Sequence, residues 1–179
     1  HTLDGKKILI ISQATADKSN LHIYSNGKLQ SVDLGERSGI IKNAFFVSDD
    51  EVVLGLRSFE IVRYNVKKRE IVWSVKPDFE VFTDLQIYDD KVFSTTEGGT
   101  IYIIDLQSGA VKRILKGANF DYIYALGVEK GVALTAGRDK ICGVYNLISG
   151  NFKRVETEFM AYSVAISGAH PFRGVVGYN

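Results

Sequence analysis

The chain has 179 residues, of which 45% are hydrophobic, so it can bury a core. Its 22 basic and 21 acidic side chains nearly cancel, which excludes a strong long-range field toward nucleic acid or an anionic membrane. The longest aliphatic run, residues 8–11, is far too short to span a bilayer, and the one cysteine, Cys142, cannot form an intramolecular disulfide.

A short pattern recurs four times along the chain. Each copy ends an apolar alternating run, and successive copies stand 40, 40 and 41 residues apart: Tyr24-Ser25, Tyr64-Asn65, Ile104-Asp105 and Tyr145-Asn146. A period near 40 with several short strands per repeat is typical of a β-propeller, whose blades are small antiparallel sheets.

The predicted elements are all strands. The first is 7–13, and the Asn-Gly pair within 25–28 predicts a tight hairpin turn after the run that ends at Tyr24. The second repeat has strands at 41–47, 51–56, 59–65 and 70–75, and the third at 83–88, 91–96, 100–106 and 110–115. The fourth has strands at 122–128, 132–136, 141–147 and 151–155, and two more follow at 161–166 and 174–178. These runs are rich in Val, Ile, Tyr and Phe, which suit a pleated and half-buried surface.

We therefore predict an all-β fold, a β-propeller of about four and a half blades, each a four-stranded antiparallel sheet. The whole chain, 1–179, is one partial propeller with approximate blades 1–37, 38–77, 78–117 and 118–158 and a partial blade 159–179. Because a half blade leaves an exposed sheet edge, we interpret the chain as a fragment of a larger propeller of about seven or eight blades. The alternatives are a closed four-bladed ring and a homodimer in which two partial rings meet edge to edge.

Two stretches resemble known propeller repeats. Residues 132–147, which contain Tyr145-Asn146, resemble the middle of a WD40 repeat, and residues 91–109 are similar to the repeats of quinoprotein-like propellers. The WD40 resemblance implies a histidine before the first strand of a blade, hydrogen-bonded to an aspartate in a turn. Neither His1, His22 nor His170 stands there. We therefore expect the structural tetrad, the group of hydrogen-bonded residues to which this histidine belongs in WD40 blades, to be missing.

The resemblance to quinoproteins implies a calcium ion and a quinone stacked on tryptophan. The only tryptophan, Trp73, falls on what reads as an outer strand, so we expect no cofactor. The degenerate repeats are also similar in style to those of accessory propellers of periplasmic nitrate reductases.

No catalytic or metal-binding motif is found. The chain has no nucleophile elbow, phosphate-binding loop, His-Glu-x-x-His, Cys-x-x-Cys or EF-hand loop, and we predict neither catalytic residues nor metal ligands. The pairs Asp49-Asp50 and Asp89-Asp90 recur 40 residues apart, and we interpret them as turn residues rather than as an acid/base pair or a calcium site.

The candidate binding residues are repeated positions on one rim. Phe79, Phe120 and Phe159 each precede the first strand of a blade, where they could anchor a partner. The alternative, which we favour for any single aromatic side chain, is packing between blades. Arg57, Glu97 and Arg138 follow second strands, and with Arg37 and Asp121 they would form a mixed-charge border around the aromatic positions. For each charged residue alone, a solvated turn is the simpler interpretation.

The leading hypothesis is a non-catalytic scaffold of WD40-like type that binds another protein, with no nucleic-acid partner and no membrane insertion. A propeller enzyme or small-ligand binder with its site in the central channel is the second hypothesis. The third is an accessory propeller for a periplasmic redox enzyme such as nitrate reductase. The compartment stays open between periplasm and cytoplasm, and we lean to the periplasm.

Overall fold

The structure is a computed structural model that describes residues 6–34, 39–77, 80–168 and 173–178. These residues form 17 β-strands and no helix, which confirms the prediction of an all-β fold. In the same ranges, no helix is long and apolar enough to cross a membrane. Contacts divide the chain into two compact units, residues 1–79 and residues 80–179, and each is described by itself.

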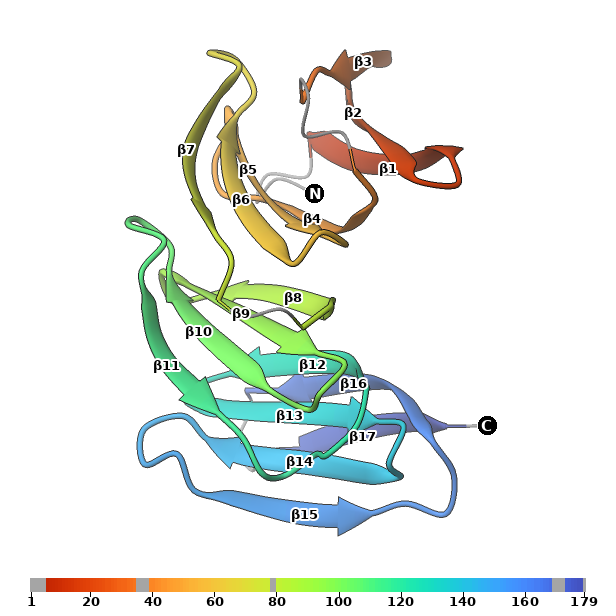
Figure 1. Cartoon of the computed structure of the whole chain (residues 1–179), viewed down its shortest axis with the longest axis vertical. Helices are drawn as coiled ribbons and strands as arrows, with labels where there is room; N and C mark the ends of the chain where they lie inside the picture. Colours follow the sequence, from red (N-terminus) through yellow and green to blue (C-terminus); the bar gives the residue numbers. More distant parts are fainter. Residues whose placement is uncertain (1–5, 35–38, 78–79, 169–172, 179) are drawn as a thin grey trace. The chain divides into compact units, whose positions relative to one another are not determined.

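Unit 1 contains two antiparallel sheets, in which strands adjacent in the sequence are also neighbours (Figure 1). Sheet 1 consists of β1 (Lys7–Thr15), β2 (Lys18–Ser25) and β3 (Lys28–Val32). Sheet 2 consists of β4 (Ile41–Phe46), β5 (Glu51–Leu56), β6 (Glu60–Asn65) and β7 (Glu70–Val75). By the sequence repeat, β1, β2 and β3 correspond to the second, third and fourth strands of sheet 2.

Unit 2 contains three antiparallel sheets, again with strands in sequence order (Figure 1). Sheet 3 consists of β8 (Phe82–Tyr88), β9 (Lys91–Thr96), β10 (Ile101–Asp105) and β11 (Val111–Leu115). Sheet 4 consists of β12 (Ile123–Glu129), β13 (Val132–Gly137), β14 (Ile141–Asn146) and β15 (Phe152–Glu156). Sheet 5 consists of β16 (Ala161–Ser167) and β17 (Arg173–Tyr178).

The turns have the chemistry that the sequence predicts. Asn26 and Gly27 have φ of 51° and 75°, the positive values that a two-residue hairpin turn requires. Asp89 and Asp90 also have positive φ, 50° and 56°, in the turn between β8 and β9. Aspartate tolerates this backbone region better than most residues, so the interpretation of Asp89-Asp90 as turn residues agrees with the structure.

The apolar core lies between sheets and within each unit. Sheets 1 and 2 enclose one cluster, which includes Leu21 and Leu54, and sheets 3 and 4 enclose another, which includes Ile103 and Leu126. Sheets 4 and 5 share a third cluster around Leu134 and Ala161. Each sheet is therefore stabilised mainly by the sheet beside it, as in other repeat folds.

A partly buried ion pair links the two central strands of sheet 2 near the end where β5 begins and β6 ends. Arg63, a buried residue of β6, donates from Nε to the Glu51 carboxylate on β5 at 2.8 Å. Asn65 Nδ2 donates to the other carboxylate oxygen at 3.2 Å. The hydrogen bonds from Arg63, more than the opposing effect of burial, hold the pKa of Glu51 below its ordinary value of 4.5.

We predict that this pair makes the stability of the protein depend on pH. Since the folded-state pKa of Glu51 is lowered, the stability it contributes is fully present above pH 4.5 and is lost as pH falls through the folded-state value. Glu51→Gln should be less stable than wild type near pH 7, and the difference should shrink toward pH 3, as measured by urea unfolding.

Glu70→Gln is the matched control, because the Glu70 carboxylate lies at the surface, where it forms an exposed ion pair with Lys68 at 3.4 Å. An identical loss of stability in both variants at neutral pH would contradict the role assigned to Glu51.

Candidate partner-binding rim

The structure describes six of the eight residues predicted to bind a partner, while Arg37 and Phe79 lie outside the described residues. In unit 1, Arg57 is exposed in the turn between β5 and β6, where its backbone N–H donates to the Ile40 carbonyl at 2.8 Å. Glu97, Phe120, Asp121, Arg138 and Phe159 all belong to unit 2.

Asp121 and Arg138 lie at the same end of sheet 4. Ile123 at the start of β12 pairs with Gly137 at the end of β13, so the residues flanking these two are neighbours. Arg138 Nε and Nη2 donate to the two carboxylate oxygens of Asp121 at 2.8 and 2.7 Å. This bidentate geometry fixes both side chains better than a single contact would.

The ion pair is the main cause of the shifted pKa values on this rim. The hydrogen bonds from Arg138, followed by that from the Tyr122 N–H, lower the pKa of the Asp121 carboxyl. The Asp121 carboxylate in turn raises the pKa of Arg138, and Tyr124 and Glu97 add smaller effects of the same sign. Glu97, from the β9–β10 turn of sheet 3, is therefore close enough to Arg138 to interact with it.

Phe120 is the exposed aromatic residue of this rim. Its side chain is 60% exposed, and its ring centroid lies 4.4 Å from the guanidinium carbon of Arg154 on β15. Arg154 is itself held, because its Nε donates to the carbonyls of Gly117 and Ala118 at 3.1 Å each. A guanidinium at this distance from a ring is attracted to it, so Phe120 is held in place although it faces solvent. We call Phe120, Asp121, Arg138 and Arg154 the rim site.

Asp139 fixes the backbone on which Phe120 stands. Its Oδ2 accepts from the Phe120 N–H at 2.9 Å, and its Oδ1 accepts from the Ile141 N–H at 3.1 Å and from Asn119 Nδ2 at 3.2 Å. Asn119 is buried, and its Oδ1 accepts from the Thr135 hydroxyl at 2.6 Å. The loop before β12 is thus tied to the β13–β14 turn by one continuous network.

In sheet 4, an asparagine makes the hydrogen bond that the WD40 resemblance would assign to the absent histidine. Asn119 stands before the first strand and donates to Asp139 in a turn, which is the role that the WD40 resemblance assigns to histidine. The hydroxyl of Tyr145, which stands where that family usually has tryptophan, accepts from the Ala118 N–H at 3.1 Å. The sequence analysis considered only an imidazole at this position and missed that a primary amide can supply an equivalent donor.

No protein-family model matches the chain, and no curated protein sequence matches it. Among solved structures, the WD40 β-propeller domain of Doa1 aligns with a TM-score of 0.75 at 15% identity over 90% of this chain and 54% of that one. The computationally designed Ika8 protein aligns with a TM-score of 0.73 at 18% identity over 94% of this chain and 58% of the other.

A second designed protein, Ika4, aligns with a TM-score of 0.68 at 21% identity over 83% of this chain and 98% of its own. The chain therefore spans a little over half the length of the Doa1 domain and of Ika8. Together with the repeated four-stranded antiparallel sheets, these alignments decide the architecture. The chain has a β-propeller fold. Sheets 2, 3 and 4 are its complete four-stranded blades among the described residues.

The propeller carries an aromatic run that the sequence analysis missed. The rings of Tyr122 and Tyr124 are 4.9 Å apart between centroids, and those of Tyr124 and Tyr162 are 4.8 Å apart. Tyr122 and Tyr162 are 40 residues apart, so the repeat itself was the signal that could have identified them. Phe159 and Met160 precede β16 and are exposed near the same end of the propeller as Tyr162.

Arg154 was also missed, and no sequence signal marks it. It stands 34 residues after Phe120, on the outer strand β15, whose residues are all exposed. In the described part of the propeller, no group of three or more His, Cys, Asp or Glu side chains is placed to hold a metal ion. Cys142 is buried on β14, and burial raises the pKa of its thiol.

We predict that Asp139 contributes strongly to the stability of sheet 4. Asp139→Ala removes an acceptor for three donors, one of them on the buried Asn119, and we expect a loss of about 2–3 kcal/mol in the free energy of unfolding. Urea unfolding measures the loss, and the exposed Glu158→Ala is the control. Unchanged stability of Asp139→Ala would contradict the network.

Proposed function

We propose that the protein is a non-catalytic interaction module that binds another protein through the rim site. The observation that carries the proposal is Phe120, a large aromatic side chain that is exposed and yet held by Arg154 and by the Asp139 network. Aromatic anchors next to arginine are the residues that most often dominate binding energy at protein interfaces. Because the Phe120 side chain is already ordered, it would lose little conformational entropy when a partner binds it.

The surroundings of Phe120 support a protein partner over a small ligand. The Asp121–Arg138 pair supplies a polar border of both signs beside an apolar centre, which is the usual anatomy of a protein interface. Since the net charge of the chain is only +1, the partner is selected by this local pattern rather than by long-range attraction.

The fold is consistent with this role. The chain shares its propeller fold with the WD40 domain of Doa1, and such propellers typically act as interaction scaffolds. A fold alone permits many functions, so the proposal depends on the rim site and not on the fold.

The proposal is tested by site-specific photo-crosslinking. A photoreactive phenylalanine analogue at position 120 should capture a defined protein from cells that make the chain. The same analogue at Ile148, which is highly exposed in the β14–β15 turn, should not capture that protein.

Once the captured protein is purified, Phe120→Ala should weaken its binding at least tenfold in a titration, as expected for an anchor residue. Ile148→Ala should leave the affinity unchanged. Equal affinity of wild type and Phe120→Ala, or capture at both positions alike, would overturn the proposal.

A further inference from the structure

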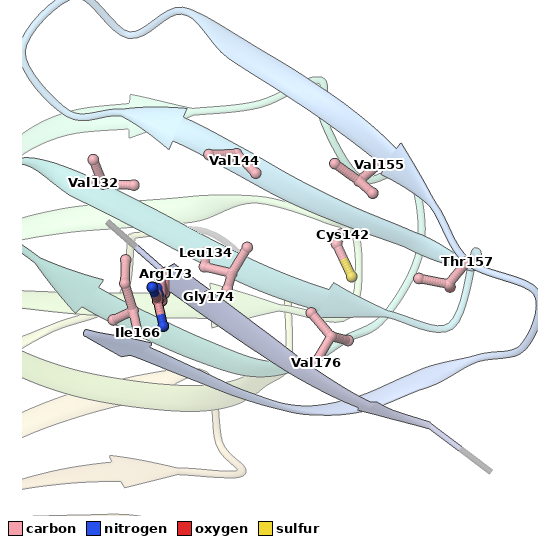
Figure 2. A pocket seen from close by; sticks show the side chains of 10 residues that line it. All are labelled: Val132, Leu134, Cys142, Val144, Val155, Thr157, Ile166, Arg173, Gly174 and Val176. Atoms are coloured by element: carbon pink, nitrogen blue, oxygen red, sulfur yellow. The ribbon is translucent and has the colours of Figure 1, made fainter. Parts of the chain in front are cut away.

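Two pockets that lie between neighbouring sheets differ in chemistry. The pocket between sheets 4 and 5 has a volume of about 450 Å³, and its lining is apolar apart from Thr157 and Arg173 (Figure 2). The pocket between sheets 1 and 2 has a volume of about 620 Å³, which is in the range of small-ligand sites, and charged side chains line much of it. We call this second pocket the charged groove. Its cations are Lys7, Lys28, Lys67 and Arg69, and its anions are Asp33, Asp49 and Asp50.

Both walls of the charged groove come from consecutive parts of the chain. One wall is the side of sheet 1 that packs on sheet 2, and the turns β4–β5 and β6–β7 form the other wall. Two rows across β1, β2 and β3 lie on that side of sheet 1: Lys7, Ser25 and Lys28 in one, and Leu9, Ile23 and Gln30 in the next. A further blade would lie against the other side of either sheet, so it would leave this groove open.

The equivalent place between sheets 3 and 4 is filled by an arginine. By strand register, Arg113 on β11 stands where Gln30 stands on β3. Arg113 Nη1 donates to the carbonyls of Leu147 and Ile148 at 2.7 and 2.9 Å. A Cβ atom at Gly150 would clash with this guanidinium. The arginine on sheet 3 therefore requires the glycine on sheet 4.

Sheets 1 and 2 have the reverse combination of residues. Gln30 replaces the arginine, and Arg69 stands where the repeat places Gly109 and Gly150, in the turn before the fourth strand. The φ angles of Arg69, Gly109 and Gly150 are 58°, 70° and 81°. Glycine adopts such angles freely, whereas a longer side chain is strained there. Strain of this kind clusters at functional sites, so Arg69 is a candidate ligand-binding residue.

Arg69 and Lys28 bring positive charge to the groove that the described residues do not neutralise. Neither side chain forms an ion pair within the described part of the chain, whereas the other two lysines of the groove contact Asp49 and Asp50 at 3.3 and 3.9 Å. The two walls of the groove thus each carry one cation that is available to an anionic ligand.

The charge of Arg69 acts inside the groove. Burial, followed by the charge of Asp33, raises the pKa of the Tyr64 hydroxyl, and the charge of Arg69 opposes this shift. That hydroxyl donates to the Asp33 carbonyl at 2.7 Å. The Arg69 guanidinium is therefore close to the end of sheet 1, where the Asp33 carboxylate would repel a ligand with many negative charges.

We propose that the charged groove binds a phosphate monoester, whose phosphate lies between Lys28 and Arg69. A monoester has a charge of about −1.5 to −2 at pH 7, which matches these two cations, and a guanidinium can donate to two of its oxygens. The organic part lies against the apolar residues of the lining, Ile23, Val32 and Val66. The groove belongs to unit 1 and the rim site to unit 2, so either proposal can fail alone.

The first test is a chemical-shift titration of the isotope-labelled 179-residue chain with phenyl phosphate. The backbone amides of Lys28 and Arg69 should shift and reach saturation. Benzoate has the same ring but a single negative charge, so it should bind about tenfold more weakly or less. Inorganic phosphate should also bind more weakly, because it lacks the ring. No saturable shift with phenyl phosphate, or equal affinity for benzoate or inorganic phosphate, would overturn the proposal.

The decisive variant is Arg69→Gly, because it removes the guanidinium and relieves the strained backbone. It should not lower the urea midpoint of unfolding, yet it should weaken phenyl phosphate binding about tenfold or more. Lys68→Gln is the matched control, since Lys68 is in the same turn but pairs with Glu70 at 3.4 Å and does not line the groove. Unchanged binding in Arg69→Gly, or an equal loss in both variants, would contradict the site.

Two further probes distinguish the source of the monoester. Tighter binding of a phosphoserine peptide than of glycerol phosphate would identify a modified protein, and the opposite order would identify a free metabolite. Both results support the same phosphate chemistry. The unphosphorylated peptide should not shift the amides of Lys28 and Arg69, and equal binding of both peptides would count against the proposal.

Discussion

The structure depends on apolar contact between the broad sides of neighbouring sheets. A small antiparallel sheet has two faces to bury, and since the described residues form no helix, here it buries them against other sheets. The three clusters of buried side chains lie between sheets 1 and 2, between sheets 3 and 4, and between sheets 4 and 5. Adjacent sheets therefore stabilise each other in pairs. Where part of a sheet side has no neighbouring sheet, as in sheets 1 and 4, its side chains stay exposed.

Hydrogen bonds at one end of sheet 4 link this packing to the candidate site. The loop before β12 connects sheets 3 and 4, and its backbone N–H groups near the core need hydrogen-bond acceptors. Ala118 and Phe120 donate to Tyr145 and Asp139, and the buried Asn119 bridges Asp139 and Thr135. Since the same loop presents Phe120, the bonds that close the core also hold the exposed ring.

Equal positions in a repeat do not have equal roles. Phe120 and Phe159 are exposed, although packing between blades was the favoured interpretation of each. Phe82 stands 40 residues before Tyr122, yet Phe82 is buried and Tyr122 contacts Tyr124 in the aromatic run. The spatial neighbours of a residue decide whether it is exposed enough to bind a partner. These neighbours differ from sheet to sheet, even for residues at the same position of the repeat.

The sequence by itself determined the fold class, the strands and the turns, because these depend on local alternation and on backbone preferences such as those of Asn26 and Gly27. It also predicted that Asp121 and Arg138 lie on one rim, because Asp121 precedes the first strand of a blade and Arg138 follows the second, and these positions meet at one end of an antiparallel pair. Only the tertiary structure decided that Arg154 supports Phe120, that Asn119 replaces a histidine, and that Tyr24 is open while Tyr64 and Tyr145 are covered. These contacts join residues that are distant in the sequence. They form only where particular sides of two sheets meet, and a local sequence pattern does not show which sides meet.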